Sequence, residues 1–213
     1  MELRCSCFAI GKSEILFLLR NGNQLLLQML KLSKNLKFIA VTAWILFSRS
    51  YDAYCTHTLT PDLSKEANPL VTVAGVSSWS VLLLILGCLT GYALFAFYIR
   101  TYKPTSLLPE EKGYSFNHFV AFLFLGYKDQ WFATLYKLPS SLTRFNNYMG
   151  EVLTKGLAYA GLVSTLMWIL IHNSEYYRSI HSAPIIYSIL IGGCFVIIYR
   201  WNKSEYKLYL QSN

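Results

Sequence analysis

Long apolar runs alternate with short polar segments along the chain. Four runs approach the length of about 20 residues that a helix needs to cross a bilayer core of about 30 Å. They extend from Phe38 to Leu59, from Leu70 to Ile99, from Val152 to Ile171 and from Pro184 to Tyr199. The second run has about 30 residues and must tilt or project beyond the membrane. The pattern predicts an all-α helical integral membrane protein with about four transmembrane helices.

A fifth apolar stretch, from Phe116 to Tyr127, is too short to span a bilayer. The residues that follow it mix aromatic side chains such as Trp131 and Phe132 with Lys128 and Lys137. Such a mixture is typical of the lipid headgroup region. We expect residues 101–151 to form a cytoplasmic loop on the membrane surface, with the stretch as an interfacial or re-entrant segment.

The composition agrees with a membrane protein. Of the 213 residues, 54% are hydrophobic and 14% are charged, and the mean hydropathy is +0.35; a soluble domain has roughly a quarter charged residues. The net charge is +8, but the basic residues flank apolar runs and no nucleic-acid-binding motif is present. The expected surroundings are therefore a lipid bilayer, with no nucleic acid as partner. The five cysteines are scattered and are typical of small apolar side chains rather than of a disulfide framework.

The distribution of basic residues predicts the orientation. With four spans, sixteen of the 19 Lys and Arg residues fall on one side, Lys65 and Arg178 fall on the other, and Arg49 lies within the first span. Because cytoplasmic segments carry the excess of Lys and Arg, both termini are predicted to be cytoplasmic. No eukaryotic targeting signal stands out, so the expected compartment is the cell membrane, specifically a bacterial inner membrane.

Residues 1–35 differ from the four-helix transmembrane domain that we expect over residues 36–213. Two short apolar pieces are separated by Asn21-Gly22-Asn23, a sequence typical of a turn. We expect a cytoplasmic or interfacial segment here. An alternative is that translation starts at Met29, which would place the preceding residues upstream of the protein.

The first predicted span contains charged residues that are expensive in a bilayer. A charge at the centre of a membrane helix costs about 2.5–3.5 kcal/mol on insertion scales. Arg49 and Asp52 are three residues apart and Thr56 follows Asp52 by four, so the three share one helix face. Two interpretations remain open. One is a neutralised pair that serves packing, and the other is a binding or proton-handling site.

The loop after this span adds Glu66 and Asn68 to the polar cluster. Asn68 before Pro69 is a helix N-cap followed by proline at the first helical position, and Glu66 would be favoured by the helix dipole. Asp52-x3-Thr56 followed by Glu66-x-Asn68-Pro69 resembles a pattern of uncharacterised small prokaryotic integral membrane proteins, over about 18 residues. The glycine that usually precedes E-x-N-P is missing here. The resemblance implies one hydrogen-bonded unit joining two helices, and no activity.

Three histidines fall on the predicted outer side of the membrane: His57, His172 and His181. Together with Glu66 they could bind zinc or another divalent metal. Metal-ligand spacings such as H-E-x-x-H are absent, and histidine is also common at interfaces. No cofactor is therefore predicted, and a divalent metal site remains an alternative.

These features leave three hypotheses of function. The first is a structural, accessory or assembly role, in which the cluster of Arg49, Asp52, Thr56, His57, Glu66 and Asn68 locks helices together. The second is a transporter or channel component, and the third is an outward-facing metal-assisted enzyme. The usual phosphate-loop, serine-elbow and haem motifs are missing from the sequence, so no catalytic residue is identified. Gly87-x3-Gly91 predicts close helix packing, within the chain, in a homo-oligomer or with a membrane partner.

Overall fold

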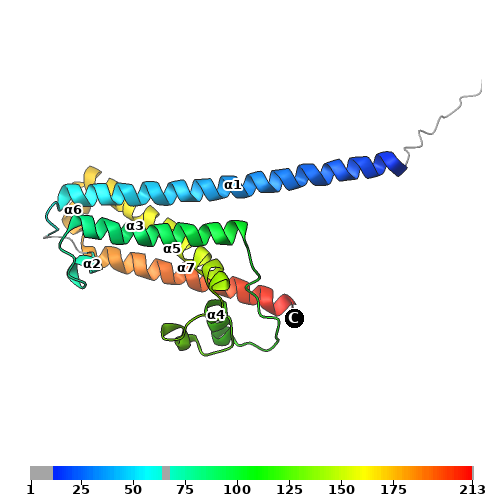
Figure 1. Cartoon of the computed structure of the whole chain (residues 1–213). Coiled ribbons are helices and arrows are strands. Elements are labelled where there is room, and N and C mark those ends of the chain that lie inside the picture. Colours follow the sequence, from blue (N-terminus) through cyan, green and yellow to red (C-terminus); the bar gives the residue numbers. More distant parts are fainter. Residues whose placement is uncertain (1–11, 64–67, 213) are drawn as a thin grey trace, which may run out of the picture. The chain divides into compact units, whose positions relative to one another are not determined.

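The computed structural model describes the backbone of residues 12–63 and 68–212 and the side chains of residues 33–63 and 68–211. Every regular element among these residues is a helix (Figure 1). The chain divides into two units, Met1–Ile39 and Ala40–Asn213, and helix α1 runs through the boundary between them. The elements are α1 Lys12–Leu59, α2 Pro69–Thr72, α3 Trp79–Tyr102, α4 Phe116–Leu125, the 3₁₀ helix η1 Trp131–Leu135, α5 Leu142–Asn173, α6 Glu175–Ile180 and α7 Ala183–Ser212.

Three of the described helices, α3, α5 and α7, are long and apolar enough to cross a membrane. Helix α5 lies in the middle, because it contacts both α3 and α7. Many apolar side chains of these helices are exposed, among them Leu84, Phe95, Leu166 and Phe195. A soluble protein would bury such continuous apolar surface. The expected class, an all-α helical membrane protein, is confirmed.

Helix α1 contains the whole of the first predicted span, but it is not among the three candidate spans. Polar residues such as Arg49 and Asp52 lower its hydropathy. Its second half packs on α5: the indole nitrogen of Trp44 donates to the main-chain oxygen of Ala158 at 3.1 Å. Ser48 is buried beside Gly161 of α5, where a Cβ would overlap the serine hydroxyl.

The predicted turn at Asn21-Gly22-Asn23 is wrong, because α1 is continuous through these residues. A single glycine between polar residues lowers helix propensity by about 1 kcal/mol, which a long helix tolerates. The expected interfacial character of residues 1–35 concerns side chains that mostly lie outside the described ones. The alternative start at Met29 stays a prediction.

The second predicted span is broken, contrary to the expectation of one helix from Leu70 to Ile99. Helix α2 forms one turn, and α3 starts only at Trp79. Between them Gly75 adopts a φ of +72°, in the left-handed region that ends helices. Asn68 caps α2 as predicted, because its side-chain oxygen accepts from the main-chain nitrogen of Leu70 at 3.0 Å.

The third and fourth predicted spans are longer than expected. Helix α5 starts ten residues before Val152, and α7 continues beyond Tyr199 to Ser212. Residues 142–151, assigned to a surface loop in the sequence, are therefore the first turns of α5. Polar residues of this segment can lie within a helix bundle because their side chains are paired, as Asn147 and Glu151 are.

Helix α4 coincides with the short apolar stretch and packs into a small protein core. It begins at the N-cap Ser115 and ends at Gly126, whose φ is +83°. Its residues Phe119 and Leu123 are fully buried. They belong to a cluster that we call the α4 core, formed by Leu107, Tyr114, Phe119, Leu123, Tyr148 and Tyr209. The apolarity of this stretch thus has a cause in protein packing, and no re-entry into a membrane is needed to explain it.

Close helix packing occurs at glycines other than the pair singled out in the sequence. A Cβ at Gly150 of α5 would overlap the main-chain oxygen of Ala96 of α3. A Cβ at Gly87 or Gly91 would meet nothing within 4 Å. The expected packing of Gly87-x3-Gly91 within the chain is therefore wrong for the described residues, and a contact with another chain through this face stays a prediction.

Candidate functional site

The predicted pair of Arg49 and Asp52 forms a network between α1 and α5. An oxygen of Asp52 lies 3.5 Å from the guanidinium of Arg49, which also donates to the hydroxyl of Ser164 at 2.8 Å. The other carboxylate oxygen accepts from the indole nitrogen of Trp168 at 2.7 Å. Both oxygens of Asp52 therefore have a partner. Two residues of α1 are tied to two residues of α5, both of which are buried.

Thr56 shares the helix face of Asp52, but its hydroxyl does not bind the carboxylate. It donates to the main-chain oxygen of Asp52 at 2.8 Å. Thr60 repeats this arrangement one turn later with the main-chain oxygen of Thr56, at 2.9 Å. Such bonds satisfy a hydroxyl within its own helix. The threonines thus fit an apolar environment without needing a partner from another helix.

The remaining members of the predicted cluster lie elsewhere. His57 is exposed and packs its ring against Trp79 at the start of α3, with 5.1 Å between the ring centroids. The indole nitrogen of Trp79 donates to the main-chain oxygen of Thr60 at 3.1 Å. Asn68 caps α2. Glu66 lies outside the described residues, so the expected unit of Asp52, Thr56, Glu66 and Asn68 is not observed as a whole.

The proposed metal ligands are not assembled among the described residues. His172 bonds the main-chain oxygen of Trp168 at 2.7 Å, within its own helix. His181 packs against Tyr177, with 5.6 Å between the ring centroids. Within residues 33–63 and 68–211, no group of three His, Cys, Asp or Glu side chains could hold a metal ion. The histidines of the predicted set each have a local structural contact instead.

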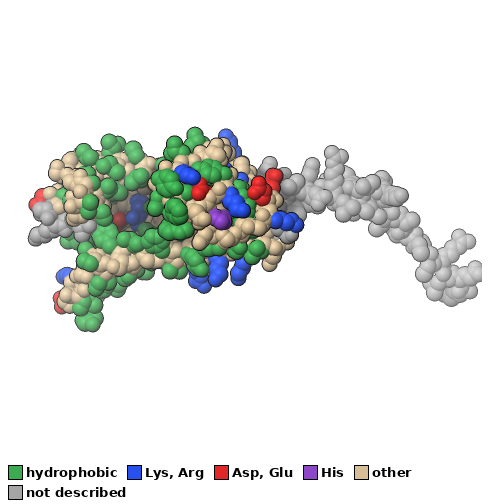
Figure 2. Space-filling model, turned by 90° about the horizontal axis from the view of Figure 1, so that it is seen from below, with side chains coloured by type: hydrophobic (Ala, Val, Ile, Leu, Met, Phe, Trp, Pro, Cys, Tyr) green, Lys and Arg blue, Asp and Glu red, His purple; other side chains and the backbone are tan. Residues whose placement is uncertain are grey.

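A cavity of about 390 Å³ lies beside Asp52, between the end of α1, the end of α5, α6 and the start of α7. Its polar lining comprises Asp52, Thr56, Thr60, Ser164, Arg178 and His181. Its apolar lining includes Leu59, Met167, Ile171, Ile186 and Leu190. Figure 2 shows a hollow between apolar surfaces at the left-hand end of the molecule, with charged side chains inside it. We call this space the α6 cavity; its volume is in the range of small-molecule sites.

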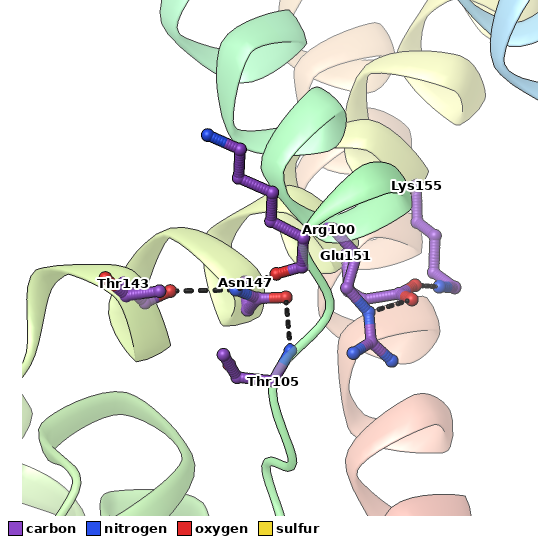
Figure 3. Close-up of polar contacts among 7 residues, drawn as sticks. Arg100, Thr105, Thr143, Asn147, Glu151 and Lys155 are labelled. Carbon is purple, nitrogen blue, oxygen red and sulfur yellow. Dashed lines mark hydrogen bonds and ion pairs between the residues drawn. The ribbon is translucent and has the colours of Figure 1, made fainter.

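A second polar network, near the other end of α5, was not identified from the sequence (Figure 3). Asn147 is fully buried. Its side-chain oxygen accepts from the main-chain nitrogen of Thr105 at 3.2 Å, and its nitrogen donates to the main-chain oxygens of Thr143 at 2.9 Å and Lys103 at 3.3 Å. One side chain therefore fixes the segment that leaves α3 against the start of α5.

One turn further along α5, Glu151 carries two ion pairs. Arg100 of α3 donates to one carboxylate oxygen at 2.8 Å, and Lys155 of α5 bonds the other (Figure 3). The spacing of Glu151 and Lys155 is a sequence signal for a helical ion pair, and a carboxylate at the start of an apolar run needs such a partner. The contact with Arg100 depends on the packing of α3 on α5 and has no sequence signature.

Comparison of the chain with models of protein families, with curated proteins and with solved structures gives no match. Its function therefore has to be inferred from the geometry of these networks and of the α6 cavity.

Proposed function

We propose that this chain is a multi-pass cell membrane protein with a structural or accessory role, in which the network of Arg49, Asp52, Ser164 and Trp168 holds α1 against α5. One observation carries the proposal: both carboxylate oxygens of Asp52 are bound by side chains of the protein. A carboxylate that acts as a base, a metal ligand or a proton carrier needs an oxygen available to its reaction partner. The engaged state of Asp52 favours a locking role.

The proposal includes α1 as a fourth span, from Phe38 to Leu59. Leu46 and Phe47 of this segment are about half exposed, as side chains facing lipid would be. Arg49 and Asp52 neutralise each other, and Ser164 and Trp168 add hydrogen bonds, which together reduce the cost of placing charges in a membrane. Four spans place both termini on the side that holds sixteen of the 19 basic residues, the cytoplasmic side by the positive-inside rule. A bacterial inner membrane is the compartment we propose.

The replacement Asp52→Asn tests the locking role. It removes the ion pair but keeps the shape of the side chain. Breaking a buried ion pair costs about 3–5 kcal/mol. Because the side chain of Asp52 is 31% exposed, we expect a loss of roughly 1–3 kcal/mol. The measurement is the folded amount recovered from membranes and its midpoint of unfolding. Glu110→Gln, which removes a carboxylate at an exposed position without an ion pair among the described residues, is the control and should leave both unchanged.

A double replacement separates locking from chemistry. Apolar residues of similar volume often replace a buried ion pair without loss of stability. The variant Arg49→Met/Asp52→Leu should therefore recover most of the folded amount lost in Asp52→Asn. If Asp52→Asn is as stable as the unchanged protein, the network does not hold the helices together and the structural role is wrong.

The α6 cavity favours a second candidate function, that of a transporter or channel component. Asp52, Thr56 and Ser164 line this space and give it a polar wall. In this case Asp52→Asn would keep the folded amount but abolish solute or proton flux into vesicles that contain the purified protein. The exposed Gly87-x3-Gly91 face is proposed as the contact with a second copy or a membrane partner. Cross-linking between chains carrying Gly87→Cys together with Cys88→Ser tests it, because the native Cys88 is also exposed.

A further inference from the structure

The wall of the α6 cavity is mostly apolar, although the charged side chains of Asp52 and Arg178 also line it. Leu59 of α1, Met167 and Ile171 of α5, and Ile186 and Leu190 of α7 line it. Such a wall accepts a hydrocarbon chain, because burial of apolar surface is worth roughly 25 cal/mol per Å². The same residues would hold a fully polar solute poorly.

The polar groups around the cavity differ in how many of their hydrogen-bonding atoms already have a partner. Asp52 has both oxygens bound, by Arg49 and Trp168. Arg178 of α6 uses its Nε to bond the main-chain oxygen of Ile171 at 3.2 Å, which fixes the side chain at the end of α5. The Nδ1 atom of His181 is buried and has no partner among the described residues.

The charge at the cavity that has no ion-pair partner is therefore positive. Asp52, the carboxylate in the lining, is paired with Arg49, whereas the guanidinium of Arg178 forms no ion pair among the described residues. Arg178 lies on the exposed rim, while the apolar wall continues along α5 and α7. A ligand that fits this arrangement has a hydrocarbon chain and a compact anionic head.

We propose that the α6 cavity binds a single-chain anionic amphiphile, represented by a long-chain fatty acid. Its carboxylate pairs with the guanidinium of Arg178 and approaches His181 at the rim, and its chain lies against Met167, Ile186 and Leu190. Arginine is well suited to this role because its planar donors match a carboxylate. The inference does not depend on the locking role of Asp52.

Quenching of tryptophan fluorescence by a brominated fatty acid tests the proposal, because Trp168 lines the cavity. The full chain in nanodiscs of phosphatidylcholine is titrated with 9,10-dibromostearate. Quenching is then reversed with unlabelled stearate or, in parallel, with stearyl alcohol. We expect saturable quenching that stearate displaces at least tenfold more effectively than the alcohol. Equal displacement by both compounds, or quenching without saturation, would overturn the proposal.

Two replacements at the rim and in the wall locate the site. Arg178→Gln should weaken binding about tenfold, the lower range for a charge-assisted hydrogen bond at an exposed position. Leu190→Phe should weaken it by filling the space for the chain. The matched controls are Arg200→Gln, exposed farther along α7, and Ile191→Phe, an exposed neighbour of Leu190. If the controls weaken binding as much as the paired replacements, the fatty acid binds elsewhere and the proposal is wrong.

The outcome is separable from that for the locking network. Arg178, Leu190 and their controls lie outside the contacts of Arg49 and Asp52, so their folded amounts should stay unchanged. Loss of saturable binding at normal folded amount concerns the ligand alone. Arg178→Gln with unchanged affinity in a folded protein would contradict the assigned head-group contact.

Discussion

The membrane-length helices and the α4 core use similar apolar side chains in opposite ways. In α3 and α7, residues such as Leu84 and Phe195 are 67% and 70% exposed. In α4, Phe119 and Leu123 are fully buried beneath residues of α5 and α7. Helix α4 lies below the long helices (Figure 1), and charged side chains gather on the surface seen from that side (Figure 2). Apolar composition alone therefore does not tell which medium covers a helix; length decides, because ten residues are too short to span a bilayer.

The polar residues of the two regions differ in the same way. Within the long helices, Asp52 and Glu151 each have two partners, at least one of which comes from a neighbouring helix. Near α4, Asp129 pairs with Lys137 at 2.6 Å within the same surface segment, where water reaches the exposed lysine. The comparison predicts that replacements in the helix contacts and the α4 core have large effects, and that replacements on lipid-facing or solvated surfaces have small ones.

The largest effect is expected for Gly150→Val. The new side chain would overlap the main-chain oxygen of Ala96 and the side chain of Arg100. Because the main chain of Ala96 belongs to α3, the overlap can be relieved only if α3 separates from α5. We expect a loss of about 3 kcal/mol or more, beyond the usual 1–3 kcal/mol for overpacking, seen as a collapse of folded protein in detergent. Gly87→Val, where a Cβ meets nothing within 4 Å, is the control. Equal loss in both variants would mean that the α3–α5 contact is not specific.

The next effect is expected for truncation in the α4 core. Leu123→Ala should lower the free energy of unfolding by about 2–5 kcal/mol, because it leaves a cavity at a fully buried position. Leu84→Ala on α3 should change it by less than about 0.5 kcal/mol, since Leu84 faces lipid both before and after the helices separate. Denaturant titration in mixed micelles measures both. A reversed order would contradict the division into a lipid-covered and a protein-covered region.

A smaller effect is expected for Tyr209→Phe. The buried hydroxyl of Tyr209 accepts from the main-chain nitrogen of Tyr114 at 3.0 Å and donates to the main-chain oxygen of Glu111 at 3.0 Å. Its removal leaves two main-chain groups without this partner, at roughly 1–3 kcal/mol. Tyr206→Phe removes one hydrogen bond, to the main-chain oxygen of Tyr114, and should cost less. Thermal unfolding of the two variants gives the order.

The smallest effect concerns the surface pair. Hydrogen bonds from Lys137 and from the main-chain nitrogen of Gln130 lower the pKa of Asp129 below its ordinary value. The contribution of the pair to stability is therefore complete above the ordinary carboxylate pKa and is lost as the pH falls through the lowered value. Lys137→Gln should raise the pKa of Asp129 in an NMR titration and leave the unfolding midpoint unchanged, because exposed pairs contribute little. A clear drop in the unfolding midpoint would contradict this prediction and would mean that the pair contributes to stability as a buried contact does.

Local signals explain what could be predicted from the sequence. Span length and hydropathy located α3, α5 and α7, the Asn68-Pro69 pair located the capped start of α2, and the spacing of Arg49 and Asp52 indicated their ion pair. Each of these depends on residues within a few positions of one another.

The missed features depend on contacts between distant residues. Asn147 bonds Thr105 and Lys103, which are over forty positions away. A single asparagine before an apolar run does not indicate from the sequence that its side chain will join two distant segments. Trp168, the partner of Asp52 on α5, and the part of the α6 cavity lining that comes from α5, α6 and α7 are likewise more than one hundred positions away from Asp52. The break before Trp79 was missed because apolar residues continue through it.

The central claim, that the long helices are covered by lipid and the α4 end by water, is tested most directly with nitroxide labels in nanodiscs. Single labels at Phe47, Leu84, Phe195 and Lys112 are compared for collision with oxygen, which partitions into lipid, and with a water-soluble nickel chelate. We expect the first three to favour oxygen and Lys112 to favour the chelate. Access of the chelate at Phe47 alone would remove α1 from the set of spans. Access at Leu84 and Phe195 would contradict the account as a whole.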